Sequence, residues 1–231
     1  MKRFYKDVAV VAAEQGFEIQ LDGRPVRTPA RAALALPNVR LAEAVAQEWR
    51  VQGDMVDPRS MPFTGLANGA IDQIEPNRES FAAGIAHYGE SDLLCYRAEG
   101  PAELIAREMA AWDPLLGWAQ QRYDVTFRVT QGIIPVAQPP ETLERLGAVV
   151  AAYDAFTLAG LSTLVTLSGS LVCGLALLEG GHDPETIWAA SEIDEAWEME
   201  QWGEDAEATA RSLRREEEFL MAHDFCEFVR R

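Results

Sequence analysis

The stretch of sequence that determines the fold class is residues 8–25, which read VAVVAAEQGFEIQLDGRP. Apolar and polar side chains alternate over residues 17–21, which is the period of two expected of a strand with one covered face. Glycine-containing turns at residues 14–16 and 22–24 separate this run from its neighbours. The pattern predicts a set of short strands within residues 8–28.

A helix is expected immediately after these strands, over residues 38–53. Asn38 is a favourable N-cap, and apolar residues recur at helical spacing from Leu41 to Trp49, ahead of Gly53. Together with the strands, this helix predicts a small mixed β/α domain over residues 1–58.

The remainder of the chain, residues 59–231, is expected to be a larger and mainly α-helical domain. Its pattern is helical almost throughout, with one short strand predicted near residues 125–131. The predicted fold class is therefore α+β, with a small N-terminal mixed domain followed by a helical one.

The net charge of the chain limits the classes of molecule that it could bind. The 231 residues carry 20 basic and 37 acidic side chains, a net charge of −17, and residues 183–231 alone contain 5 basic and 15 acidic ones. Such a chain repels phosphate backbones and anionic lipid headgroups, so we expect no nucleic-acid partner. The acidic excess at the end of the chain is better suited to a protein partner.

The cellular compartment is indicated by the cysteines and by the start of the chain. Cys95, Cys173 and Cys226 are odd in number and widely spaced, which fits buried thiols in a reducing compartment. No apolar stretch of signal-peptide length follows Met1. We therefore expect a cytoplasmic protein.

Residues 155–178 form an uncharged run of 24 residues, long enough to span a bilayer. Ser and Thr are frequent in it, and Ser168-Gly169-Ser170 interrupts it near its middle. Two short buried helices are the favoured interpretation and a membrane span is the alternative, and we expect no stable membrane insertion.

Motifs of the common enzyme classes are missing from the sequence. It contains no glycine-rich phosphate loop, no Gly-x-Ser-x-Gly elbow and no His-Glu-x-x-His, and it has only three histidines. We expect no enzyme, no cofactor and no metal site. Two alternatives remain: a helical protein that binds a small ligand between the helices of residues 155–178, and a hydrolase that uses paired carboxylates. The acids available for the hydrolase are Asp194, Glu198, Glu200, Glu204, Asp205 and Glu207.

The candidate functional residues lie in a helix predicted over residues 183–202. Trp188, Glu195, Met199 and Trp202 fall within about 60° of one another on a helical wheel, apart from the apolar stripe that contains Ile187. This second stripe is either a further buried face, with Glu195 paired to an arginine, or a protein-binding surface, because Trp and Met are enriched at interfaces.

Seven short motifs occur in an order that resembles a known family: Lys2-Arg3-Phe4-Tyr5-Lys6, Leu21-Asp22-Gly23-Arg24-Pro25 with Thr28-Pro29, Glu48-Trp49, Met61-Pro62, Asp92-Leu93-Leu94-Cys95-Tyr96-Arg97, Trp112-Asp113-Pro114-Leu115-Leu116 and Trp202-Gly203. The sequence is similar to the assembly chaperones of the F-type ATP synthase catalytic sector, which bind its alpha subunit. The resemblance covers nearly the whole chain. It implies a bacterial relative of a mitochondrial matrix chaperone.

The resemblance also implies a function and a site. Such proteins hold the free alpha subunit, shield the surface that the beta subunit later covers, and release it on assembly. Their sensitive acidic stretch precedes the Trp-Gly motif and corresponds here to Asp194, Glu195 and Glu200. Glu192 and Glu198 depart from the family pattern, where Arg and Gln are expected. The expected partner-binding residues are Trp188, Asp194, Glu195, Met199, Glu200 and Trp202, in a monomeric protein.

Overall fold

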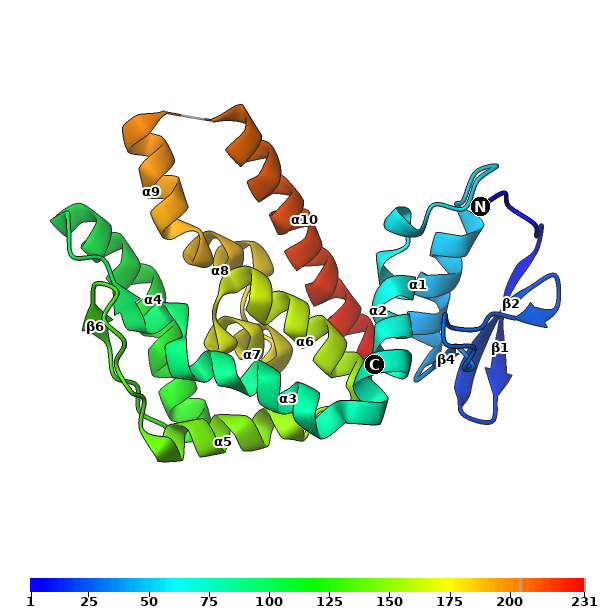
Figure 1. Ribbon diagram of the computed structural model, residues 1–231, viewed down its shortest axis with the longest axis horizontal. Helices are drawn as coiled ribbons and strands as arrows, with labels where there is room; N and C mark the ends of the chain where they lie inside the picture. The colour runs from blue at the N-terminus through cyan, green and yellow to red at the C-terminus, as the bar shows by residue number, and fades with distance from the viewer. Residues whose placement is uncertain (204, 231) are drawn as a thin grey trace. The chain divides into compact units, whose positions relative to one another are not determined.

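The computed structural model describes residues 1–203 and 205–230. It contains a small sheet near the N-terminus followed by helices along most of the chain, which confirms the α+β class (Figure 1). The chain separates into two compact units. Unit 1 comprises residues 1–78, 154–160 and 224–231, and unit 2 comprises residues 79–153 and 161–223. The sequence-based division at residue 58 stays a prediction.

Unit 1 is built on a β-hairpin. Its elements are β1 (Val8–Ala13), β2 (Gly16–Leu21), β3 (Arg24–Pro25), β4 (Ala35–Leu36), α1 (Val39–Arg50), η1 (Pro58–Ser60), α2 (Pro62–Gly69), η2 (Ala70–Ile74) and η3 (Glu75–Asn77). β1 and β2 pair antiparallel with Val10 opposite Ile19, and both β3 and β4 pair with β2. Strands within residues 8–28 are thus confirmed, while β4 lies beyond the predicted range.

Helix α1 covers this sheet. The Asn38 side chain accepts a hydrogen bond from the N–H of Leu41 at 2.9 Å, the cap expected from the sequence. Leu41 and Val45 are fully buried with Ile19 in the core of this unit. Farther along α1, the Glu48 carboxylate accepts hydrogen bonds from the backbone N–H groups of Phe63 and Thr64 at 2.7 and 2.8 Å, at the start of α2. The helix therefore joins the sheet to α2 within one packed unit.

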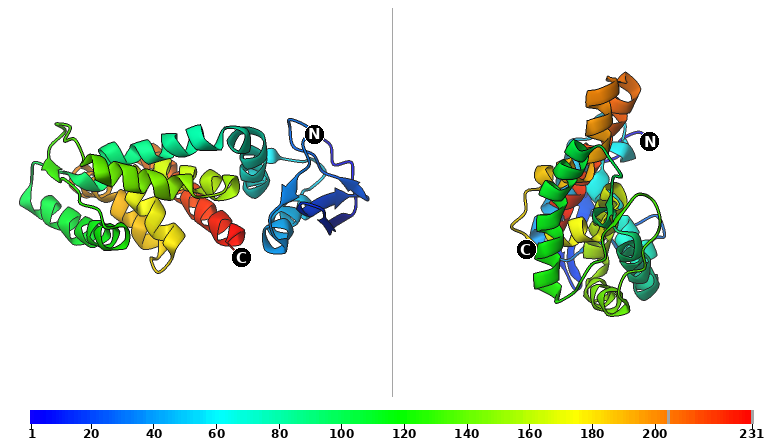
Figure 2. Two further views of the ribbon diagram at one scale, coloured as in Figure 1. Left: turned by 90° about the horizontal axis from the view of Figure 1, so that it is seen from below. Right: turned by 90° about the vertical axis from the view of Figure 1, so that its left-hand side faces the viewer.

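Unit 2 is almost entirely helical (Figures 1 and 2). Its elements are α3 (Arg78–Ala86), η4 (His87–Ser91), η5 (Leu93–Cys95), β5 (Tyr96–Arg97), α4 (Ala102–Tyr123), β6 (Thr130–Gln131), α5 (Pro140–Ala151), α6 (Ala155–Ser168), α7 (Leu171–Glu179), α8 (Pro184–Ser191), α9 (Ile193–Trp202) and α10 (Ala206–Val229); the ends of α3, α6 and α10 extend into unit 1. The short strand expected near residues 125–131 is restricted to β6. It pairs in parallel with β5, a strand that the sequence did not reveal.

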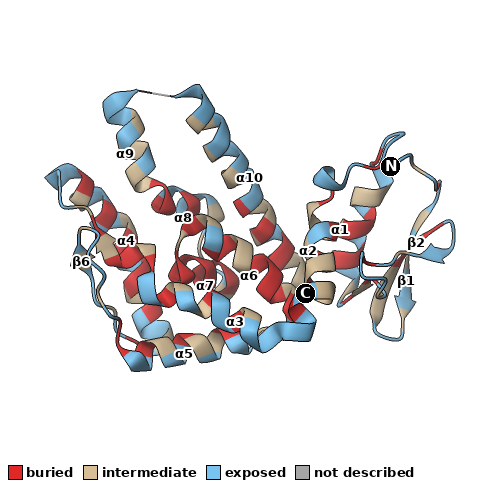
Figure 3. Cartoon of the chain, in the orientation of Figure 1, coloured by how far each residue is buried: buried red, intermediate tan, exposed pale blue. Residues whose placement is uncertain are grey.

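The uncharged run at residues 155–178 folds as the two short helices α6 and α7, separated by Gly169 with a φ of +67°. Every residue from Leu171 to Leu178 is buried, and α7 is accordingly mostly red in Figure 3. Gly174 lets the two helices approach closely, because a β-carbon there would lie 2.7 Å from Val165. Within the described part of the chain, no helix combines the length and the apolar character needed to cross a membrane.

Candidate partner-binding site

The acidic segment that carries the predicted site residues forms two helices instead of one. Asp183 caps α8 by accepting a hydrogen bond from the N–H of Thr186 at 2.9 Å, as its sequence position suggests. The helix ends at Ser191, and Glu192 departs from helical geometry with φ −106° and ψ 18°. The prediction of a single helix over residues 183–202 was therefore wrong at Glu192. A wheel drawn through this break does not describe the positions of the side chains beyond it.

Glu192 is held at the break by a polar contact with α10. Arg215 lies 3.1 Å from Glu192 Oε1 and 3.2 Å from Oε2, and the Ser212 hydroxyl donates to Oε2 at 3.3 Å. Arg215 also donates to the carbonyl oxygen of Leu167 at 2.9 Å. Burial raises the pKa of Glu192, while the adjacent guanidinium of Arg215 opposes that shift. These contacts fix the direction in which α9 leaves α8.

Trp188 lies beneath this contact and not on the surface. It is only 4% exposed, and its ring centroid is 5.2 Å from that of Phe219. The guanidinium carbon of Arg215 is 5.3 Å from the Trp188 ring centroid. In the folded chain Trp188 supports the Glu192–Arg215 pair and presents no surface to a partner.

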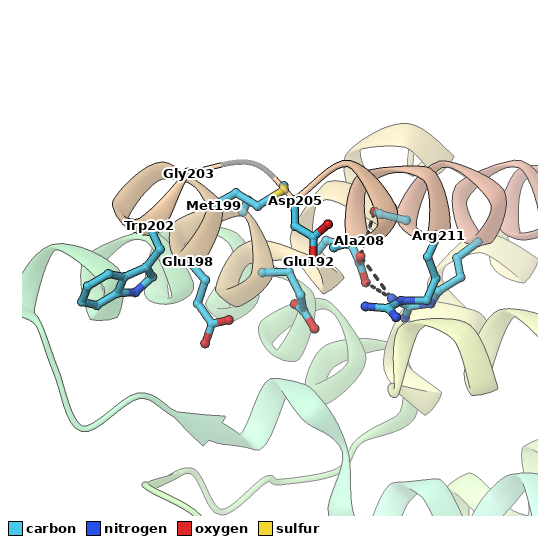
Figure 4. A pocket seen from close by; sticks show the side chains of 12 residues that line it. Glu192, Glu198, Met199, Trp202, Gly203, Asp205, Ala208 and Arg211 are labelled. Carbon is cyan, nitrogen blue, oxygen red and sulfur yellow. Dashed lines mark hydrogen bonds and ion pairs between the residues drawn. The ribbon is translucent and has the colours of Figure 1, made fainter.

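Helices α9 and α10 border a groove of about 320 Å³ that contains half of the predicted residues. Figure 4 shows its side chains, among them Glu198, Met199 and Trp202 on α9 and Arg211 on α10. We call this the acidic groove; it is lined by Glu192, Glu195, Ala196, Glu198, Met199, Trp202, Gly203, Asp205, Ala208, Arg211, Ser212 and Arg215.

The exposed residues of the acidic groove combine an aromatic ring with free carboxylates. Trp202 is 88% exposed, whereas Met199 is partly covered. Among the described residues, Glu195 makes no hydrogen bond or ion pair, so the arginine partner considered for it in the sequence is not present. The groove therefore offers an apolar surface together with a Glu195 carboxylate that has no ion-pair partner among the described residues, while Arg211 and Arg215 also border it.

Asp194 and Glu200 lie instead on the face of α9 that packs against α4. Arg107 of α4 donates to both oxygens of Glu200, at 2.8 and 2.9 Å, and its guanidinium carbon lies 4.8 Å from the centroid of the Trp197 ring. When α9 is treated as a separate helix, a spacing of three residues relates Asp194, Trp197 and Glu200. This spacing places the three side chains on one face of the helix, and it could have been read from the sequence.

Asp194, which is half-buried, lies next to the buried carboxyl group of Glu108 on α4. Glu108 is completely buried and accepts hydrogen bonds from the N–H of Ala98 at 3.0 Å with each of its oxygens. Burial, together with the charge and hydrogen bond of Asp194, raises the pKa of Glu108, and Arg97 opposes this shift. One oxygen of Asp194 is buried without any other hydrogen-bond partner among the described residues. Protonation of Glu108 supplies a hydrogen-bond donor for this oxygen.

The predicted site residues thus occupy three different environments. Glu195, Met199 and Trp202 share the acidic groove, Asp194 and Glu200 face α4, and Trp188 is buried. Sequence reasoning missed the residues that hold these groups, Arg107, Glu108 and Arg215, because long-range partners leave no local pattern. Glu204, another of the acids considered in the sequence, lies outside the described residues.

The described residues contain neither a cluster of metal ligands nor an exposed thiol. No group of three or more His, Cys, Asp or Glu side chains that could hold a metal ion occurs within residues 1–203 and 205–230. The three cysteines are free and buried, and burial raises the pKa of Cys95 and Cys173 to about 12. Such thiols are unreactive in the folded protein, because the reactive thiolate form is not populated near neutral pH.

Comparisons with known proteins connect this architecture to one family. Residues 2–120 match the family model described as ATP12 chaperone protein. The crystal structure of Atp12 from Paracoccus denitrificans superposes with a TM-score of 0.95 at 41% identity, covering 99% of this chain and 98% of that one. A mutant form of the same P. denitrificans protein also gives a TM-score of 0.95, at 40% identity, covering 99% of this chain and 97% of that one. The mitochondrial protein atp12 of Schizosaccharomyces pombe is 26% identical over 214 residues, 87% of this chain and 74% of that protein.

Proposed function

Since the chain belongs to the ATP12 chaperone family, we propose that it binds the unassembled alpha subunit of the F-type ATP synthase catalytic sector. Bound there, it shields the beta-facing surface of the subunit from aggregation, and it releases the subunit when assembly proceeds. The family is named for a chaperone and not for an enzyme. We place this activity in the bacterial cytoplasm, where buried free cysteines remain reduced, and assign it to a monomer.

The observation that carries the proposal is the exposure of Trp202 beside Glu195 at the acidic groove. A tryptophan that is 88% exposed leaves a large apolar surface in water, and such side chains often supply much of the binding energy when a partner covers them. Glu195, which has no ion-pair partner among the described residues, favours a basic group at the matching position of a partner. The groove therefore suits a protein surface that is apolar and locally basic.

The proposed roles follow from the three environments of the site residues. Trp202 and Met199 cover apolar surface on the alpha subunit, while Glu195 pairs with one of its basic groups. Asp194 and Glu200 hold α9 against α4, and Trp188 supports the base of the groove through Arg215. All six residues thus contribute, but only three of them touch the partner.

Release requires no chemical step in this proposal. The beta subunit offers the alpha subunit a permanent interface, and interfaces of that class commonly bury ~2,000 Å² or more. The acidic groove is bordered by only two helices, α9 and α10, and we propose that it makes a smaller contact than this. Competition therefore displaces the chaperone once the beta subunit arrives.

The test uses purified alpha subunit and the full-length chaperone. We expect the wild-type chain to suppress aggregation of the alpha subunit at about a one-to-one ratio without ATP. Glu195→Lys reverses the charge beside Trp202 and should weaken binding by tenfold or more, because a like charge then faces the basic group of the partner. Capture that is unchanged at moderate salt contradicts the role of Glu195.

A matched control variant shows whether the loss of affinity comes from the position of Glu195 or only from the change in net charge. Glu217 is an exposed glutamate on α10 and is not among the residues that line the acidic groove. Glu217→Lys changes the net charge by the same amount as Glu195→Lys and should leave the affinity unchanged. Equal losses with both variants indicate general electrostatic attraction and contradict a specific site.

A further inference from the structure

The loop that carries β6 exposes two adjacent isoleucines. Ile133 is 95% exposed and Ile134 is 76% exposed, and both lie in unit 2 between α4 and α5. Residues 129–138 contain no charged side chain, although a quarter of the whole chain is charged. Single exposed apolar residues are ordinary, whereas an adjacent pair in an uncharged segment resembles a contact site.

The base of this loop is closed by the side chain of Gln138. Its amide donates to the carbonyl oxygen of Arg128 and accepts from the N–H of Arg128, both at 2.9 Å. Gln138 itself is buried, and the Arg128 guanidinium donates to the carbonyl oxygen of Ala137 at 2.9 Å. The two ends of the segment that carries the isoleucines are therefore joined by three hydrogen bonds.

The turn directly before the isoleucines is set by Gly132. Its N–H donates to the carbonyl oxygen of Arg97 at 2.8 Å, next to the pairing of β6 with β5. Gly132 has a φ of +73°, and a β-carbon there would lie 2.8 Å from the Glu99 carboxylate. Glycine thus meets the backbone conformation that this turn requires. The isoleucines follow a fixed turn, and this reduces the entropy lost when a partner covers them.

We infer that Ile133 and Ile134 form a second contact surface for the unassembled subunit and insert into an apolar depression on it. This inference rests on the proposed function. The pair supplies no charge and Pro135 supplies no N–H, so the tip suits an apolar protein pocket and not a phosphate group. The net charge of −17 further disfavours nucleic acid and anionic membranes.

A second copy of this chain is the competing occupant. Unit 2 contains an apolar hollow of about 600 Å³ bordered by Ala111, Pro114 and Ile187, which could receive isoleucine side chains. Two copies each carry a net charge of −17, so association between them works against electrostatic repulsion. An apolar surface on another protein is the favoured occupant.

The test compares the affinity of the full-length chain for purified alpha subunit with that of I133S/I134S. Because both side chains project into solvent, the variant should keep its Tm and circular dichroism spectrum. We expect its affinity to fall at least tenfold. Leucine at both positions should restore binding to within about threefold, because an apolar contact tolerates a similar side chain.

The matched control is V39S/V51S, which removes two apolar side chains that are 51% and 62% exposed in unit 1. It should bind like the wild type. Unchanged affinity of I133S/I134S, in an assay where Glu195→Lys does weaken binding, overturns this inference and leaves the proposed function intact. Failure of the wild-type chain to bind the alpha subunit overturns both. A wild-type dimer in sedimentation that I133S/I134S converts to monomer identifies the second copy as the occupant and overturns the inference.

Discussion

Arg107 of α4 and Glu200 of α9 form an ion pair with two hydrogen bonds of 2.8 and 2.9 Å, and the same guanidinium covers the ring of Trp197. Both charged side chains are about half exposed. The pair therefore adds little to global stability, but it sets the position of a helix that contains no buried residue.

The variant Arg107→Ala should show whether the ion pair acts on global stability or on the position of α9. We expect Tm to change by about 2 °C or less, because exposed ion pairs contribute little, while affinity for the alpha subunit falls several-fold as α9 loses its fixed position. Arg122→Ala is the control, since Arg122 makes a similar exposed pair with Glu179 on α7, away from α9. An equal loss of affinity in both variants contradicts the positioning role of Arg107.

The buried Glu108–Asp194 contact predicts a pH dependence of stability. The pKa of Glu108 is raised in the folded chain, so the folded state holds its proton more tightly than the unfolded state does. Its contribution to the free energy of unfolding is fully present below the unfolded pKa of ~4.3 and is lost as pH rises from there through the raised folded pKa. Glu108→Gln should therefore flatten the decline in stability above pH ~5.

Urea unfolding of the wild type and Glu108→Gln between pH 5 and 8 measures this difference. Burial also raises the pKa of Glu48, Asp92 and Glu192, so the comparison concerns the change in slope and not the whole slope. Glu103→Gln, at an exposed site on the same helix, should leave the slope unchanged. Parallel curves for the wild type and Glu108→Gln rule out a proton held at this contact.

The close approach of α6 and α7 predicts opposite effects for two glycine substitutions. Gly174→Ala places a β-carbon 2.7 Å from Val165 and 2.8 Å from Leu161, so it should lower the free energy of unfolding by about 1–3 kcal/mol. Gly117→Ala, inside α4 with nothing within 4 Å of the new carbon, should raise it by about 0.5–1 kcal/mol. Chemical denaturation of both variants measures the two values, and a stabilised Gly174→Ala contradicts the packing described.

Because the three cysteines are buried, we expect their thiols to react much more slowly in the native protein than in the unfolded protein. Burial raises the pKa of Cys95 and Cys173 to about 12 and also raises that of Cys226. A thiol-reactive disulfide reagent at pH 8 should label almost none of them in the native state and all three after denaturation. Rapid labelling of one native thiol contradicts its burial.

Much of the fold could be predicted because its signals are local. The alternation over residues 17–21, the Asn38 cap and the break at Gly169 each follow from conformational preferences of nearby residues. The strand β5 could not be predicted, because two residues carry no detectable period and its existence depends on pairing with β6, more than 30 positions away.

The sequence could predict which segment of the chain contains the candidate site, but not which of its side chains are exposed together. The sequence identifies the acidic segment and its tryptophans, yet the interruption at Glu192 depends on Arg215, which follows 23 residues later. The helix is broken there, and Trp188 is 4% exposed whereas Trp202 is 88% exposed, so the two do not share a face as they would on a continuous helix. The roles of Asp194 and Glu200 likewise depend on side chains of α4.

Helix α9 has no buried residue, and it is tan and pale blue along its length in Figure 3. Most substitutions on it therefore remove no core packing and cost the fold little. Residues of the acidic groove on α9 can consequently diverge while the rest of the chain stays folded. A recognition surface placed in this way can change in step with its partner, so its specificity can evolve almost independently of stability.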